Sequence, residues 1–177
     1  MRLRRSVAIV IAVLILVLLV RGVFHVVWDK GETLLVSVDV TQPFYPVYFG
    51  SADGAGLIPE FRQGEGTIEE RIASLLEGPR LPGLVGVIPR DVRLLGYSQQ
   101  NGILSLSFSH HLMTNHPGGS TGEILTVYGI VNTLVGARGV EKVQILVENR
   151  PIITLAGHLD LRGPLSKDYE LLGSSHI

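Results

Sequence analysis

The sequence predicts an α+β domain over residues 47–164, in which two helices pack on one face of a mainly antiparallel sheet. Two observations support this fold class. The segment twice places a pair of short strand patterns before an amphipathic helix, and strand patterns outnumber helical ones throughout. Strands joined by short turns usually pair as hairpins, and helices covering one face of such a sheet give an α+β sandwich.

The first of these units begins with a hairpin. Val47–Phe49 and Leu57–Phe61 flank the turn-rich residues 51–56, which is the pattern of two strands joined by a flexible turn. A helix is then expected from Thr67, because its hydroxyl can cap the first turn while Glu70 returns a hydrogen bond to the cap. The apolar side chains on one face of this helix are Ile68, Ile72, Leu75 and Leu76.

The second unit has a stronger turn signal. Val92–Ser98 and Ile103–Ser109 bracket Asn101–Gly102, a dipeptide that accepts the positive φ angles of a tight hairpin turn. Alternate residues of the later strand point to opposite faces, so one face should be buried and the other should face water or a partner. The buried set is Leu104, Leu106 and Phe108, and the open set is Ser105, Ser107 and Ser109.

The chain after this hairpin predicts one more helix and one more pair of strands. The helix should run from residue 120 or 121 to about Val135 and be the more deeply buried of the two, since its apolar stripe is wider. Val143–Val147 alternates like a half-buried strand and turns at residues 148–150 into a last strand, Pro151–Leu155. The polar tail, residues 165–177, is expected to fray.

Residues 1–28 predict a signal anchor that crosses a membrane once through residues 7–28. Three arginines, Arg2, Arg4 and Arg5, come before an uninterrupted apolar run, and apolar residues resume after Arg21 as far as Trp28. The positive-inside rule places the N terminus in the cytoplasm and the C-terminal domain on the extracytoplasmic side of the cell membrane.

Two other interpretations of this segment stay open. The uninterrupted run Val7–Val20 is nearer in length to a signal-peptide core than to a spanning helix, so cleavage is one alternative, although no A-x-A-like pattern of small residues follows it. A buried core helix is the other. The chain has no cysteine, so a lipid-modified N terminus is not expected.

Residues 29–46 are expected to link this segment to the domain. Within them, Leu34–Val40 alternates apolar and polar residues, which fits a half-buried strand and an extended tether equally well. Pro43 and Pro46 should break any strand that continues, so the domain is predicted to begin at Val47.

Charge and composition narrow the class of partner. Residues 1–28 hold four arginines and no acidic residue, so removing them from the formal net charge of -1 leaves the rest of the chain at -5. An acidic exported domain is not the electrostatic footprint of a nucleic-acid-binding protein. Without cysteine the domain has neither disulfides nor thiolate metal ligands, and its core must supply its stability.

Several short sequence blocks follow one another in a specific order and spacing. They are Val47-Tyr48-Phe49, Leu57-Ile58-Pro59-Glu60, Leu75-Leu76-Glu77-Gly78-Pro79, Val87-Ile88-Pro89, Leu104-Ser105-Leu106-Ser107-Phe108, Ile130-Val131-Asn132-Thr133-Leu134 and Val143-Gln144-Ile145-Leu146-Val147. This succession, over about residues 47–162, resembles the GerMN domain of bacterial sporulation and spore-germination proteins. The resemblance implies an extracytoplasmic module, similar in fold to the ring-building domains of the channel that joins mother cell and forespore, and it implies assembly rather than catalysis.

Two features depart from the family pattern. The best-known sporulation member carries two such domains behind a lipid-anchored cysteine, whereas this sequence predicts a single domain behind a helical anchor. The family often has glycine in the final hairpin, where this sequence has Asn149–Arg150. Asparagine tolerates positive φ, so only the geometry of that turn is affected.

The residues Gly118–Gly122 match the G-x-S-x-G nucleophile elbow of serine hydrolases. Asp160 or Asp168, followed by His176, would supply the acid and the histidine in the required order. However, the residues before Ser120 do not form a strand pattern, and the repeated strand-helix units of a hydrolase are missing from the sequence. We therefore expect Ser120 to cap the second helix in a capping box completed by Glu123, three residues on.

The candidate metal ligands in the sequence are three histidines, His110, His111 and His116. Adjacent residues on a strand point to opposite faces and no carboxylate lies among the three in sequence, so we expect solvated histidines at loop ends. His158 and Asp160 could share a face of an extended segment, which favours a local hydrogen bond.

Two further segments have alternative interpretations. The apolar, glycine-rich stretch Arg80–Val87 is either a connection packed against the sheet or a loop that contacts a partner. Asn132 and Thr133 interrupt an apolar helix, and a buried polar pair bonded to a neighbouring strand is favoured over a binding site.

The function expected from these features is that of a scaffold or interaction protein of the bacterial cell envelope, acting in sporulation or germination. Its expected partners are other envelope or sporulation proteins, including further copies of itself on the membrane. The alternative is a peptidoglycan-binding module, for which the aromatic candidates are Tyr45, Tyr48, Tyr97 and Trp28. A serine hydrolase comes third; we expect no enzymatic activity, no metal and no cofactor.

Overall fold

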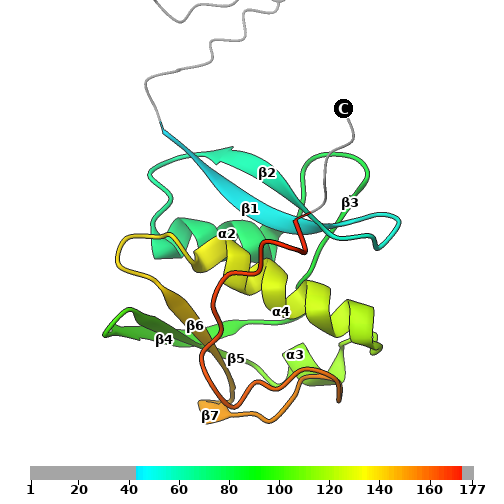
Figure 1. Ribbon diagram of the computed structural model, residues 1–177, viewed down its shortest axis with the longest axis vertical. Helices are drawn as coiled ribbons and strands as arrows, with labels where there is room; N and C mark the ends of the chain where they lie inside the picture. The colour runs from blue at the N-terminus through cyan, green and yellow to red at the C-terminus, as the bar shows by residue number, and fades with distance from the viewer. Residues whose placement is uncertain (1–42, 173–177) are drawn as a thin grey trace, which may run out of the picture. The chain divides into compact units, whose positions relative to one another are not determined.

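The computed structural model describes residues 43–172, and the predicted anchor, residues 1–28, lies outside them. The elements of the described chain are shown in Figure 1. In order, they are β1 (Phe44–Ser51), β2 (Leu57–Gln63), α2 (Ile68–Glu77), β3 (Leu84–Val85), β4 (Leu94–Gln100), β5 (Ile103–Phe108), α3 (His111–Thr114), α4 (Ser120–Leu134), β6 (Lys142–Val147) and β7 (Arg150–Pro151).

The strands form two sheets, so the prediction of one sheet with helices on one face is wrong although the α+β class is confirmed. The first sheet has the order β2-β1-β3 and is antiparallel, and the second has the order β4-β5-β6-β7. In the second sheet β5 and β6 run parallel, because α4 carries the chain across from one to the other. The helices α2 and α4 lie between the two sheets (Figure 1).

The first hairpin and helix follow the sequence closely. β1 and β2 pair in an unbroken register from Phe44 opposite Gln63 to Gly50 opposite Leu57. Thr67 and Glu70 form the predicted capping box at the start of α2.

The predicted break at Pro46 is wrong. β1 begins at Phe44, three residues before the expected start, and Pro46 lies within it opposite Phe61. Proline lacks an amide donor and is tolerated where one side of a strand is unpaired. β1 meets that condition here, because β3 pairs with it only at Gly50 and Ser51.

The second hairpin confirms its turn dipeptide. Asn101 and Gly102 have φ angles of 51° and 78°, and β4 and β5 pair antiparallel on either side. At the last hairpin Glu148 and Asn149 both take positive φ, and β7 is limited to Arg150–Pro151. The predicted last strand was therefore too long.

The serine side of β5 is less open than its alternation predicts. Ser105 is half-buried, but Ser107 and Ser109 are buried. Ser107 Oγ accepts a hydrogen bond from the Asn149 amide, and Ser109 Oγ accepts one from the Arg93 amide. The neighbouring turns therefore cover this end of the strand.

The C-terminal tail was expected to fray, but residues 165–172 pack onto the domain. Leu165 pairs with Val143, and Leu172 makes a bridge to Leu57. Backbone hydrogen bonds to two different sheets account for the order of this polar segment.

α4 is the more deeply buried helix, as predicted. Its largest fully buried apolar residues pack with the buried sides of both sheets in one core: Val127, Ile130 and Leu134 with Phe49, Leu57, Leu104, Leu106 and Phe108. Within residues 43–172, none of the helices has the length and apolar character needed to cross a membrane.

Candidate functional site

The nucleophile-elbow motif does not assemble a hydrolase site in the described chain. Ser120 is the first residue of α4, an exposed position that follows the N-cap Gly119. Asp160 pairs with Arg162, and Asp168 bonds Asn132 and the Glu170 amide. His176 lies outside the described residues.

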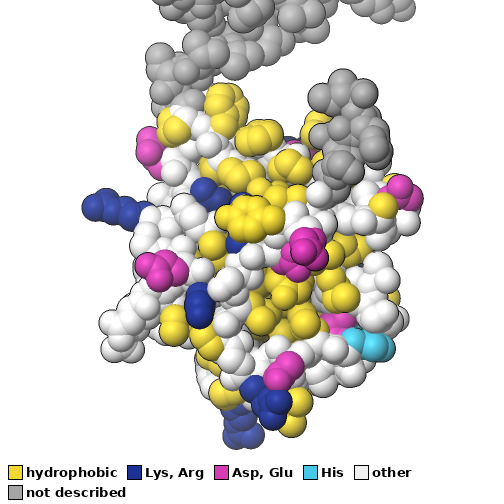
Figure 2. Space-filling model, viewed as in Figure 1, with side chains coloured by type: hydrophobic (Ala, Val, Ile, Leu, Met, Phe, Trp, Pro, Cys, Tyr) yellow, Lys and Arg dark blue, Asp and Glu magenta, His cyan; other side chains and the backbone are white. Residues whose placement is uncertain are grey.

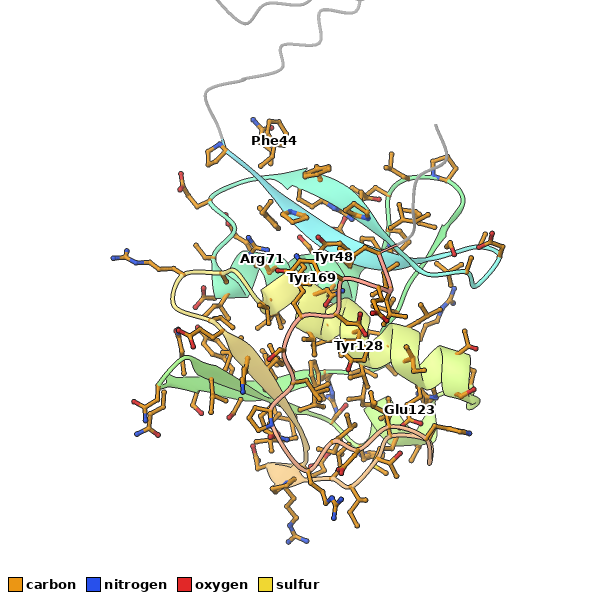
Figure 3. The ribbon with its side chains drawn as sticks, viewed as in Figure 1. Phe44, Tyr48, Arg71, Glu123, Tyr128 and Tyr169 are labelled. Carbon is orange, nitrogen blue, oxygen red and sulfur yellow. The ribbon has the colours of Figure 1, made fainter. Side chains whose placement is uncertain are left out.

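The predicted capping box at Ser120 is also wrong, and Glu123 has another role. The N-cap is Gly119, whose φ of 80° suits glycine, and it makes no side-chain cap. Glu123 is fully buried in the first turn of α4, where it faces the loop that follows β7 (Figure 3).

Glu123 holds that loop through both carboxylate oxygens. Oε1 accepts hydrogen bonds from the Thr154 hydroxyl at 2.6 Å and the Leu155 amide at 2.8 Å. Oε2 accepts them from the His158 amide at 2.8 Å and lies 3.1 Å from His158 Nδ1. The predicted local bond between His158 and Asp160 is therefore replaced by this long-range contact.

The same contacts set the charge state of Glu123. Burial raises the pKa of the carboxyl, but the hydrogen bonds from Thr154 and the backbone amides of residues 155, 156 and 158 outweigh it and leave the pKa at about 2. Glu123 is thus ionised at neutral pH and stabilised mainly by dipoles. It is a structural clamp, not a general acid.

The three histidines do not converge on one site, and each contacts different neighbouring groups. The rings of His110 and His111 are 4.0 Å apart, and Glu148 lies 3.5 Å from His110 Nδ1. His116 Nε2 lies 3.2 Å from the Thr126 hydroxyl in α4. No group of three or more potential metal ligands occurs among residues 43–172.

A groove beside the Arg80–Val87 stretch could receive a partner. It has a volume of about 880 Å³ and is partly open to solvent. The elements around it are the β1–β2 turn, the end of α2, the segment from β3 to residue 92 and the first half of α4. We call it the groove; among its lining residues are Gly50, Leu76, Pro79, Val85, Pro89 and Gly122.

A buried ion pair fixes one wall of the groove. Glu60 and Arg62, on the inner side of β2, are only 3% and 4% exposed, and Arg62 Nη2 lies 2.6 Å from Glu60 Oε1. Glu60 Oε2 also accepts hydrogen bonds from the amides of Arg80 and Leu81, at 2.9 and 2.8 Å. Arg62 Nη2 in turn donates to the Gly78 carbonyl at 2.7 Å.

These contacts resolve the two interpretations of the Arg80–Val87 stretch. Its start is pinned to β2, and its end pairs with β1 through β3. Leu81 and Val85 nevertheless remain 54% and 52% exposed. The stretch is therefore a rigid connection that presents apolar side chains at the edge of the groove.

Asn132 and Thr133 are a buried polar pair, as the sequence favours, but only Thr133 bonds a neighbouring strand. Thr133 Oγ1 accepts a hydrogen bond from the Tyr48 amide in β1. Asn132 exchanges two hydrogen bonds with the backbone of Asp168. Arg71 adds a third link by donating to the Thr133 carbonyl near the C-terminal end of α4.

The sequence patterns did not point to the Glu60–Arg62 pair or to the clamp role of Glu123. A signal for the pair was present, because opposite charges two residues apart on a strand share one face. The partner of Glu123 lies more than thirty residues away in an irregular loop, and no local pattern connects them.

The geometry defines a two-sheet α+β domain with an open groove and clamped loops. Residues 46–153 match the model of the Germane family, whose description is "Sporulation and spore germination". The chain belongs to this family. No curated protein matches the sequence.

Solved structures agree with this family. A Clostridium perfringens protein classed provisionally as a lipoprotein is 26% identical with a TM-score of 0.52, covering 75% of this chain and 93% of that one. The tandem GerMN domains of the Bacillus subtilis sporulation protein GerM give 20% identity and a TM-score of 0.61, covering 82% of this chain and 51% of theirs. The first GerMN domain of GerM alone gives 17% identity and a TM-score of 0.55, covering 71% of this chain and 96% of that one. The chain therefore spans about half of the tandem structure, and the likeness to GerM is one of fold.

Proposed function

We propose that this protein is a membrane-anchored, extracytoplasmic interaction protein of the cell envelope that acts in sporulation or germination and is not an enzyme. The observation that supports this most is the groove, which is lined by exposed Val85 and adjoined by exposed Leu81 on a connection held by buried Glu60. Apolar side chains presented on a rigid wall can contact a partner without the entropy cost of ordering a loop.

The lining suits a segment of another protein. Glycine and proline residues form much of the wall, so the partner can approach the backbone closely, and only a few charged side chains, such as Glu77, Arg90 and Asp91, lie along it. A volume of this size lies in the range of ordinary ligand sites and accommodates several side chains of an extended peptide.

The test places a photo-crosslinking amino acid at Leu81 or Val85 of the full-length chain in sporulating cells of its native host. Both positions should give a crosslinked protein product, and a control at the similarly exposed Ile153 should not. Absence of any product, together with saturable pelleting on purified peptidoglycan, would replace this proposal with the glycan-binding alternative.

Topology is tested separately. A protease added to intact spheroplasts should remove the domain that follows residue 28. Protection of the whole chain would contradict the extracytoplasmic location.

A further inference from the structure

The outer side of the first sheet carries exposed aromatic residues that neither the core nor the groove uses. Phe44 is 51% exposed and Phe61 is 66% exposed. Alternation along β1 and β2 places both on the side opposite to the buried Tyr45, Val47 and Phe49.

Two prolines lie beside these phenylalanines on the same side of the sheet. Pro46 lies directly opposite Phe61 in the strand register, and Pro59 lies opposite Tyr48 on the same side of the sheet. The C-terminal segment extends the surface with Tyr169, which is 71% exposed. We call this surface the aromatic patch: Phe44, Pro46, Pro59, Phe61 and Tyr169.

A lysine connects the two parts of the patch. Lys167 Nζ lies 4.9 Å from the centre of the Tyr48 ring and 5.4 Å from that of Tyr169. Figure 3 shows Tyr48 and Tyr169 close together and Phe44 projecting at the start of β1. Hydrophobic side chains gather over this end of the domain in Figure 2.

We propose that the aromatic patch lies against the lipid bilayer and inserts its rings at the interface between headgroups and acyl chains. The inference rests on the proposed membrane anchor. Tyrosine favours this depth of a bilayer and phenylalanine side chains insert there as well, whereas a face of such rings and prolines offers few hydrogen bonds to a sugar.

The position of the tether favours the membrane over other occupants. The chain enters the domain at Phe44, which is itself part of the patch, and residues 29–43 connect it to the apolar segment. Fifteen residues span at most about 50 Å even when fully extended. The patch is therefore held close to the bilayer at a high effective concentration, where weak insertion is sufficient.

Charge contributes little to this contact. Lys167 is half-buried and followed by Asp168 and Glu170, and the part of the chain after residue 28 carries a formal charge of -5. Binding should therefore depend on ring insertion and should not strengthen when anionic lipid is added.

The experiment uses single-tryptophan chains in phosphatidylcholine vesicles with and without brominated acyl chains. Wild-type protein has Trp28 alone, which reports on the anchor. Two full-length variants, Trp28→Phe with Phe61→Trp and Trp28→Phe with Ile153→Trp, report on the patch and on an equally exposed position near β7, at the other end of the domain (Figure 1).

Bromine should quench Trp28, and it should lower the emission of the tryptophan at position 61 by about twofold while leaving that at position 153 unchanged. Matching thermal unfolding curves confirm that the variants fold. If Trp28 is not quenched, the anchor is absent and both proposals fall.

Three results would overturn the patch proposal while leaving the anchor intact. Each result assumes that bromine quenches Trp28, and acrylamide is added as a water-soluble quencher. A tryptophan at position 61 that acrylamide quenches and bromine does not lies in water. One that neither agent quenches is covered by protein, such as a second copy. Peptidoglycan binding that is lost on Phe61→Ser, without bromine quenching, assigns the patch to glycan.

Discussion

Two buried glutamates hold two loops of this domain by different means. Glu60 is neutralised by the guanidinium of Arg62 and pins the amides of Arg80 and Leu81 at the groove. Glu123 has no lysine or arginine within ion-pair distance among the described residues, and hydroxyl, amide and imidazole groups of residues 154–158 surround it instead.

The difference shows which clamp can be exchanged and which cannot. A buried ion pair can be replaced as a unit by apolar side chains of similar volume, often without loss of stability. The amides of Arg80 and Leu81 belong to exposed residues, so water can replace Glu60 as their acceptor. The Leu155 amide is buried and would be left without an acceptor if Glu123 were replaced. The domain can therefore lose the Glu60–Arg62 pair at the groove and remain folded, whereas the loop of residues 154–158 depends on Glu123.

The largest effect is expected from Glu60→Ala. It leaves the buried Arg62 guanidinium with only the half-exposed Glu77 carboxylate, 3.5 Å from Nη1, which should lower the free energy of unfolding by about 4 kcal/mol in urea titrations. The double variant Glu60→Leu with Arg62→Met should recover most of that loss. A single variant within about 1 kcal/mol of wild type would show that the pair is not buried in solution.

Glu123→Ala should cost somewhat less, about 3 kcal/mol, because it leaves unpaired amide and hydroxyl donors rather than an unpaired buried charge. Hydrogen exchange should accelerate at Leu155 and His158 and stay slow at Leu81. Equal acceleration at Leu81 would mean that the two clamps are coupled rather than independent.

The pH dependence of stability distinguishes the clamps further. The folded pKa of Glu123, about 2, lies below its ordinary value of 4.5, so its contribution is complete above pH 4.5 and is lost as the pH falls towards 2. We expect a loss of roughly 2 kcal/mol over this interval that is missing in Glu123→Gln. An identical acid profile in both proteins would remove Glu123 as the cause.

Ser120→Ala should have the smallest effect, within about 0.5 kcal/mol, since the exposed hydroxyl caps nothing. A thermal melt of the variant measures this. A loss of about 1 kcal/mol would support the interpretation of Ser120 as a helix cap. Labelling of Ser120 by a fluorophosphonate would support the serine-hydrolase interpretation.

Local signals in the sequence predicted most of the elements correctly. The Asn101–Gly102 turn and the Thr67 cap are short-range features whose physics is complete within a few residues. The long helix followed from its apolar stripe in the same way. Each of these required no knowledge of distant parts of the chain.

The errors arose where distant segments decide the outcome. The separation into two sheets depends on which strands meet after α2 and α4 are in place, and hairpin patterns do not contain that information. The order of residues 165–172 comes from partners such as Val143 and Asn132. The groove likewise combines four segments, so the sequence singled out only the Arg80–Val87 stretch.

The most direct test of the central claim compares the two clamps for partner capture. A photo-crosslinker at Leu81 is introduced into two full-length backgrounds, Glu60→Leu with Arg62→Met and Glu123→Gln, and crosslinked in sporulating cells of the native host. We predict that the first background, although stable, loses the crosslinked product because Arg80 and Leu81 are no longer pinned, while the second retains it. Equal yields in both backgrounds would contradict the claim that the groove wall fixed by Glu60 is the surface that binds the partner.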